Sequence, residues 1–196
     1  MDLGVLGGVA LADWLIIIFF LGFFVLGFAQ GTIRRLIGIA SILFSFLFAA
    51  NVAEPLGNFL EANWTDQNPG YSYMVGFLTV FVAASLAFAI VVQGFYKPQP
   101  LFEKARFVDE IIGGVLGLLQ AAIVLGALII ILDSYYRASN VAAGQYELGF
   151  LRDLWSFIDT SATADIFRSR LIPAFFILVG LFIPSNLKAL FPASPS

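Results

Sequence analysis

Four long apolar stretches constrain the fold of this chain more than any other feature of its sequence. Each is long and apolar enough to cross about 30 Å of hydrocarbon as a helix, which rises about 1.5 Å per residue. Because lipid offers the backbone no hydrogen-bond partners, such segments have to be helical. We therefore predict an all-α integral membrane bundle of four transmembrane helices, arranged as two hairpins. The spans run approximately over Trp14–Ala29, Ile33–Ala53, Tyr73–Phe95 and Glu110–Leu132.

The residue composition fits a protein whose solvent is lipid. Hydrophobic residues make up 60% of the chain and charged residues 12%, whereas soluble domains have roughly 45–50% and 25%. The 22 phenylalanines point the same way, since phenylalanine is favourable at the centre of a bilayer. The formal net charge of −3 is small and spread along the chain, so it indicates no nucleic-acid partner.

The residue types that are missing exclude several chemistries. The chain contains neither cysteine nor histidine, which rules out a disulfide, a thiolate metal site and a Ser-His-Asp arrangement. The commonest ligand of haem and metal ions is therefore absent. The sequence also has no nucleotide-binding loop, zinc signature or nucleophile elbow. We expect a protein that is not an enzyme, with no catalytic residue, no cofactor and no metal site.

The distribution of lysine and arginine predicts how the spans are oriented. Both turns within the hairpins are basic, whereas the connection Glu54–Ser72 has no lysine or arginine. Because positive charge favours the cytoplasmic side, we expect both hairpin turns in the cytoplasm and both termini outside. The connection mixes turn-forming residues with interfacial aromatics, so it is expected at the headgroup level. The deciding basic residues are Arg34, Arg35, Lys97, Lys104 and Arg106.

The sequence divides into a four-helix module, residues 1–136, and an interfacial C-terminal region, residues 137–196. In the latter, Leu171–Ile183 is a short hydrophobic segment, which favours an interfacial or re-entrant helix over a tilted fifth crossing. Before it, hydrophobic residues recur at spacings of three and four with charged residues between them. This pattern predicts an amphipathic helix on the outer surface of the membrane or on the rim of the bundle. Its hydrophobic positions are Leu148, Leu151, Leu154, Trp155 and Ile158.

The first hairpin turn combines small residues with two arginines. Gly27 and Gly31 are four residues apart, a spacing that lets neighbouring helices approach closely and gives a turn the dihedral freedom it needs. Arg34 and Arg35 follow and are expected to lie at the interface and set the orientation. The alternative for the arginines is binding to an anionic lipid or a cytoplasmic partner.

The second hairpin turn leads into the fourth span. Asp109 is expected as the N-cap residue of this span, where the helix macrodipole favours a carboxylate. The alternative is an ion pair from Asp109 to Arg34 or Arg35, which would join the two hairpins. Gly113 and Gly117 repeat the four-residue glycine spacing one and two turns further on.

Few polar residues lie within the predicted spans. Gln120 is the clearest one, and we interpret it as an interhelical hydrogen-bonding residue, with a functional role as the alternative. No charged residue is expected at mid-depth, which argues against an ion-coupled transporter. Asp13 and Asp133 lie at the outer ends of the first and fourth spans, where water is expected to reach them.

Three sequence blocks, in this order and spacing, resemble the bacterial colicin V production protein family of small inner-membrane proteins. The first block follows an apolar span entered by an aspartate. The second block departs from the family pattern directly after its aspartate, where the family often has a basic residue and this chain has Glu110. The blocks are Gly27–Arg34 after Asp13; Asp109 with Gly113 and Gly117; and the weaker match Ser169–Pro184.

The resemblance implies a multi-pass protein of the bacterial inner membrane. Members of the family are associated with toxin production or export and with envelope homeostasis, and related four-helix modules precede periplasmic protease domains. The resemblance therefore favours a scaffold or sensor role, with membrane lipids and other membrane proteins or a second copy of the chain as partners. Two other hypotheses stay open: an accessory subunit of a respiratory or photosynthetic complex, and a channel or transporter.

Overall fold

The computed structural model describes residues 11–63, 68–95, 106–137 and 147–179. Within these ranges the chain is helical and contains no strand. Four of its helices have the length and composition to cross a membrane, which confirms the predicted membrane bundle. They are α1 (Leu11–Gln30), α2 (Thr32–Asn63), α3 (Pro69–Phe95) and α4 (Arg106–Tyr136).

The connection between the second and third spans is shorter than predicted. Helix α2 continues through Pro55 to Asn63, so much of the expected loop is helix. At the other side of the connection, the side chain of Asn68 accepts a hydrogen bond from the backbone N–H of Gly70 at 2.9 Å. Asn68 thus caps α3, and Pro69 occupies the first helical position, where its missing N–H costs nothing. The turn-forming residues recognised in the sequence therefore begin a helix.

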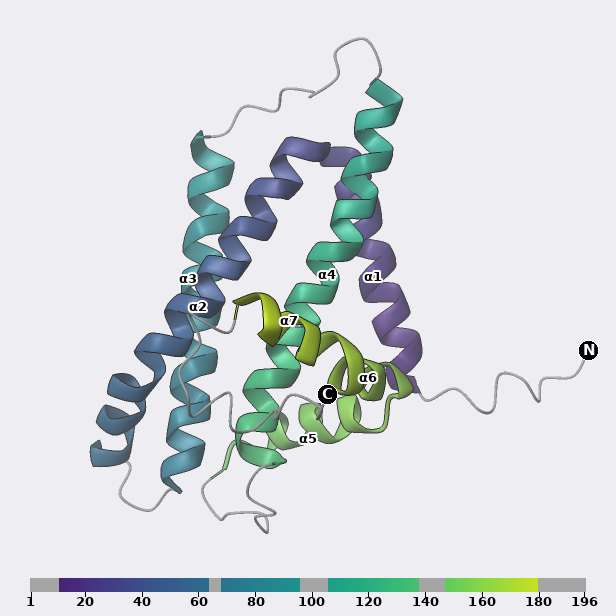
Figure 1. The fold of residues 1–196 in the computed structure, drawn as a ribbon. Coiled ribbons are helices and arrows are strands. Elements are labelled where there is room, and N and C mark those ends of the chain that lie inside the picture. The colour runs from purple at the N-terminus through teal and green to yellow at the C-terminus, as the bar shows by residue number, and fades with distance from the viewer. Residues whose placement is uncertain (1–10, 64–67, 96–105, 138–146, 180–196) are drawn as a thin grey trace, which may run out of the picture.

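The helices of each hairpin pack mainly on helices of the other hairpin, and less on each other. The most extensive contacts pair α1 with α4 and α2 with α3, and α2 also crosses α4. Helices α1 and α2 touch little beyond their shared turn, and α2 runs diagonally from the end of α1 towards the lower part of α3 (Figure 1). At that turn Gly31 has a φ of +77°, a conformation that glycine adopts without steric cost.

The two ends of the bundle differ. We call the end that contains the Gly31 turn the turn end. The opposite end carries two short helices, α5 (Gly149–Asp159) and α6 (Ala162–Ile166), which we call the C-terminal layer (Figure 1). Helix α5 coincides with the predicted amphipathic helix and buries Leu151 and Ile158.

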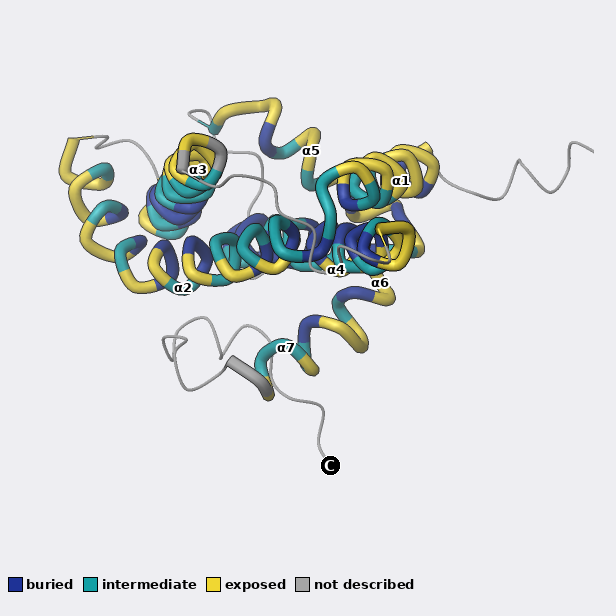
Figure 2. Tube along the Cα trace, turned by 90° about the horizontal axis from the view of Figure 1, so that it is seen from above, coloured by how far each residue is buried: buried dark blue, intermediate teal, exposed yellow. Residues whose placement is uncertain are grey.

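The chain then turns back along the bundle. A π-helical segment, η2 (Phe167–Leu171), leads into α7 (Ile172–Val179), which lies against α4 on the side opposite α1 and α3 (Figure 2). The eight described residues of α7 extend about 12 Å, and the interfacial or re-entrant placement of the segment stays a prediction. The last part of the predicted segment, residues 180–183, lies outside the described residues.

A single apolar core joins the bundle and the C-terminal helices. Phe46 of α2 is fully buried; its ring centroid lies 5.4 Å from that of Phe77 in α3 and 5.6 Å from that of Phe175 in α7. Many outward-facing residues of the spans are large and hydrophobic, among them Ile18 and Ile90. Such a surface is stable in contact with lipid, where apolar side chains cost nothing to expose.

Candidate functional site

Glycines bring α1 and α4 into backbone contact. A Cβ atom added to Gly27 would collide with the carbonyl oxygen of Gly113, and one added to Gly117 would collide with the carbonyl oxygen of Phe23. Such contact is possible only where both helices lack side chains. The predicted glycines of the two sequence blocks thus face each other, although they lie in different hairpins.

The two hairpin turns meet at Gly31 and Asp109. The hydroxyl of Thr32 donates a hydrogen bond to the backbone carbonyl of Asp109 at 3.1 Å. A Cβ atom at Gly31 would lie 2.5 Å from the Asp109 carboxylate, and Asp109 is only 4% exposed. The carboxylate therefore occupies the space that the missing side chain of Gly31 leaves open.

Asp109 is not the N-cap residue that the sequence suggested. Helix α4 begins at Arg106 and is extended there by an i,i+4 ion pair between Arg106 and Glu110, with an N–O distance of 3.0 Å. Asp109 is consequently a first-turn residue, where its charge still matches the macrodipole. The ion pair from Asp109 to Arg34 or Arg35 stays a prediction.

Arg35 points into the bundle and reaches Gln120. Its Nη1 donates a hydrogen bond to Oε1 of Gln120 at 2.7 Å, and its guanidinium lies 5.8 Å from the ring centroid of Phe23. Both partners are buried, with exposures of 5% and 9%. Gly38 makes room for the amide, because a Cβ atom there would lie 3.0 Å from Nε2 of Gln120. Arg34, in contrast, is only half-buried.

This contact places a buried positive charge between α1, α2 and α4. Gln120 lies fourteen residues after Arg106 and sixteen before Tyr136, near the middle of α4. Arg35 begins near the turn end, but its long side chain lets the charge lie far from its own backbone. The Nε of Arg35 is buried and has no hydrogen-bond partner among the described residues.

At the other end, Asp13 of α1 holds α6. Its carboxylate accepts hydrogen bonds from the hydroxyls of Ser161 at 2.6 Å and Thr163 at 2.7 Å, and from the backbone N–H groups of Ala162 at 3.3 Å and Thr163 at 3.0 Å. Ser161 also caps α6 by accepting from the N–H of Ala164. A carboxylate from one helix thus satisfies the free N–H groups at the start of another.

Asp133 of α4 binds both α5, which precedes α6 in the chain, and η2, which follows it. Its two oxygens accept a bidentate pair of hydrogen bonds from Arg168, at 2.7 Å and 2.8 Å, and Trp155 of α5 donates its indole N–H at 2.9 Å. Arg168 also contacts Asp159 at 2.6 Å. Burial alone lowers the pKa of Arg168, but the hydrogen bonds and charge of Asp133 and then Asp159 outweigh it and raise the pKa above its ordinary value.

Asp13 and Asp133 are therefore not the water-exposed residues that the sequence suggested. Asp13 is 7% exposed and Asp133 is 2% exposed. The C-terminal layer covers both carboxylates, and no local pattern in the sequence indicates that residues so far along the chain do so. Arg168 was missed for the same reason, because its partner Asp133 lies 35 positions away.

Glu147 completes the attachment of the layer. Its carboxylate binds Arg152 of α5 at 2.6 Å and accepts a hydrogen bond from the hydroxyl of Tyr135 at 2.7 Å. The hydroxyl of Tyr71 in α3 accepts a hydrogen bond from the backbone N–H of Leu148 at 2.7 Å. Helices α1, α3 and α4 thus all bind the C-terminal region through polar groups at this end.

Comparison with known proteins assigns the chain to a family. No curated protein and no solved structure matches it significantly. The family model described as colicin V production protein matches residues 12–175, which include all four spans, the C-terminal layer, η2 and the first part of α7. The matched range contains the glycine crossing, the Arg35–Gln120 contact and the residues around Asp13 and Asp133. The chain is a membrane protein and belongs to the colicin V production protein family.

Proposed function

We propose that this protein is a non-enzymatic scaffold of the bacterial inner membrane that binds other membrane proteins through its C-terminal layer. In this role it serves toxin production or export, or envelope homeostasis. The description of the family, which names the production of colicin V and no reaction, supports this proposal.

The observation that carries the proposal is the way in which the layer is attached. Two buried carboxylates, on α1 and α4, hold α5 and α6 through hydrogen bonds and ion pairs. Buried charge-assisted hydrogen bonds of this kind are strong and fix geometry. The layer is thereby presented as a rigid surface, which is what a docking platform requires.

The outward face of α5 offers side chains for such docking. Phe150 of α5 is 64% exposed and Leu148, which precedes the helix, is 46% exposed. Leu151 and Ile158 of the same helix are buried. Hydrophobic side chains on the free face of a fixed helix are typical of sites that bind another protein. On the predicted orientation, this surface lies on the periplasmic side.

The proposal is tested by affinity purification in mild detergent from the native membrane. The test variant is Asp133→Asn, which weakens the attachment of α5 and η2; the control is Glu61→Gln, which removes an exposed carboxylate at the same end of the bundle. We expect the wild type and the control to retain one reproducible membrane-protein partner. We expect Asp133→Asn to retain several-fold less, since it loses part of a buried ion pair.

Three outcomes are informative. A wild-type chain that purifies without any reproducible protein partner would contradict the scaffold role. Equal retention by Asp133→Asn, with the variant shown by its unfolding temperature to be folded, would contradict the role of the layer. Co-migration of the wild type with a haem-bearing or pigmented complex on a native gel would instead favour an accessory subunit.

A further inference from the structure

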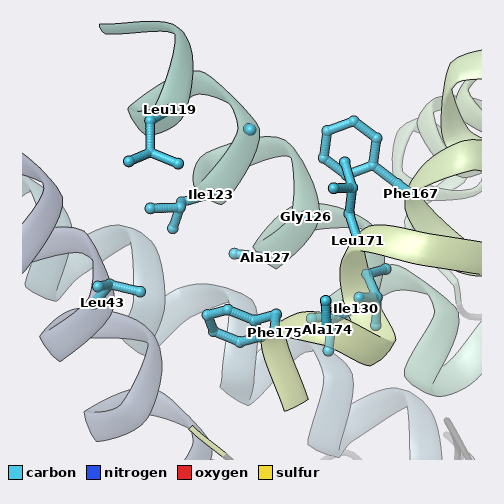
Figure 3. A pocket seen from close by; sticks show the side chains of 12 residues that line it. Leu43, Leu119, Ile123, Gly126, Ala127, Ile130, Phe167, Leu171, Ala174 and Phe175 are labelled. Atoms are coloured by element: carbon cyan, nitrogen blue, oxygen red, sulfur yellow. The ribbon is translucent and has the colours of Figure 1, made fainter. Parts of the chain in front are cut away.

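An apolar groove runs along the side of α4 that faces α7 (Figure 3). Its volume is about 320 Å³. Helices α2 and α4 form two of its walls, and η2 and α7 form the third. The lining side chains are Leu43, Leu119, Ala122, Ile123, Gly126, Ala127, Ile130, Phe167, Leu171, Ile172, Ala174 and Phe175.

The groove is long, and it lies within the depth of the membrane. Leu119 and Ile130 line it at positions eleven residues apart on α4, a rise of about 16 Å. This is roughly half the hydrocarbon thickness of a bilayer, and so about the length of the acyl chains of one leaflet. Because α4 spans the membrane, the molecules beside the groove are lipids.

A charged residue adjoins the lining of the groove in η2. Arg170 directly precedes Leu171, a lining residue in η2, and is exposed. The neighbouring Arg168 is bound to Asp133 and Asp159, whereas Arg170 makes no ion pair or side-chain hydrogen bond with the described residues. An exposed guanidinium beside an apolar groove suits the phosphate of a lipid headgroup.

We propose that the groove holds one acyl chain of an anionic phospholipid and that Arg170 binds the phosphate of its headgroup. The apolar lining supplies affinity for the chain, as burial of each methylene group does in an apolar site. Arg170 supplies preference for a negatively charged headgroup. This inference does not depend on the proposed scaffold function.

The test measures lipid retention by native mass spectrometry of the full chain in mild detergent. The probes are phosphatidylglycerol and phosphatidylcholine with identical acyl chains, added separately. Ala174→Phe places a ring in the groove from its exposed α7 wall, and Ala87→Phe makes the same change on a lipid-facing position of α3. Arg170→Gln removes the proposed phosphate ligand, and Arg106→Gln removes an exposed arginine at the turn end.

We expect the wild type and Ala87→Phe to retain one phosphatidylglycerol per chain. Ala174→Phe should retain about tenfold less, the effect of losing burial of a few methylene groups. Arg170→Gln should weaken phosphatidylglycerol about fivefold, because one basic residue near a lipid surface contributes ~1 kcal/mol. It should weaken phosphatidylcholine less, because the choline cation of that headgroup already balances the charge of its phosphate, and Arg106→Gln should change neither.

The proposal is overturned if Ala174→Phe retains as much lipid as Ala87→Phe, or if the wild type does not prefer phosphatidylglycerol. It is also overturned if the wild type retains only detergent. Should Ala174→Phe fail to fold, Ala122→Phe fills the same groove from the α4 side, and its retention decides the matter by the same criterion.

Discussion

At the scale of single residues, the Arg35–Gln120 contact is the feature most at odds with the surrounding lipid. A charged side chain in a membrane is expensive unless polar groups surround it. Within the part of the chain that the structure describes, Arg35 has one side-chain hydrogen bond, to Gln120, and the ring of Phe23 lies nearby. The amide of Gln120 therefore stabilises a charge, which is a larger role than the neutral interhelical bond that its position in the sequence suggested.

The contact between Arg35 and Gln120 predicts how the stability of the protein responds to substitution of either residue. Gln120→Leu should lower the free energy of unfolding by about 1–3 kcal/mol, because it leaves a buried donor unsatisfied. Arg35→Met combined with Gln120→Leu should recover part of that loss, since replacing both polar partners with apolar residues removes the unpaired charge. Unfolding of the purified protein in detergent measures both effects. Strictly additive losses in the double variant would show that the two residues are not coupled.

At the scale of helices, the glycine crossing decides which elements become neighbours. Gly27, Gly113 and Gly117 let α1 lie directly on α4, although α1 precedes α2 in the chain. The same residues explain why α1 packs on α4 and not on α2, although only the Gly31 turn separates α1 from α2 in the chain. Two helix pairs result, α1 with α4 and α2 with α3, and each pair takes one helix from each hairpin. This arrangement joins the two hairpins more firmly than contacts between their turns alone would.

The crossing can be tested within one helix. Gly27→Ala should destabilise the protein by about 1–3 kcal/mol, because the added methyl group overpacks a backbone contact. Gly22→Ala is the matched control, since nothing lies within 4 Å of its added Cβ atom; it should be neutral or stabilise by about 0.5–1 kcal/mol through helix propensity. Thermal unfolding in detergent compares the two. Equal behaviour of both variants would contradict a close crossing.

At the scale of the whole molecule, different kinds of contact hold the two ends of the bundle together. The turn end is held by glycines, Thr32 and the Asp109 carboxylate, whereas the opposite end is held by buried carboxylates that bind the C-terminal layer. Basic residues at the turn end predict that it faces the cytoplasm. The C-terminal layer would then face the periplasm, where the proposed partner binds.

The orientation has a direct test, which is simplified by the absence of cysteine from the natural sequence. Single cysteines replace Ser156 on α5 and Arg106 at the turn end, both of which are exposed. A membrane-impermeant maleimide applied to intact spheroplasts should label Ser156→Cys and should label Arg106→Cys only after permeabilisation. The reverse labelling pattern would invert the proposed orientation and place the layer in the cytoplasm.

The class of fold follows from the sequence alone, because apolar segments of this length in a chain with few charges have no stable arrangement other than membrane helices. Local pattern also predicted the amphipathic helix α5, which buries Leu151 and Ile158, and the glycine-bearing turn at Gly31. These features depend on residues close together in the chain, so their spacing carries the information.

Contacts between residues far apart in the chain depend on how the helices pack. Asp13 binds residues about 150 positions away, Asp133 binds Arg168, and Arg35 extends to Gln120. No periodicity encodes such pairs, because the packing of whole helices sets the distances between them. The four spans could therefore be predicted from the sequence, whereas the burial of their terminal carboxylates, the buried charge of Arg35 and the groove beside α7 depend on how the helices pack together.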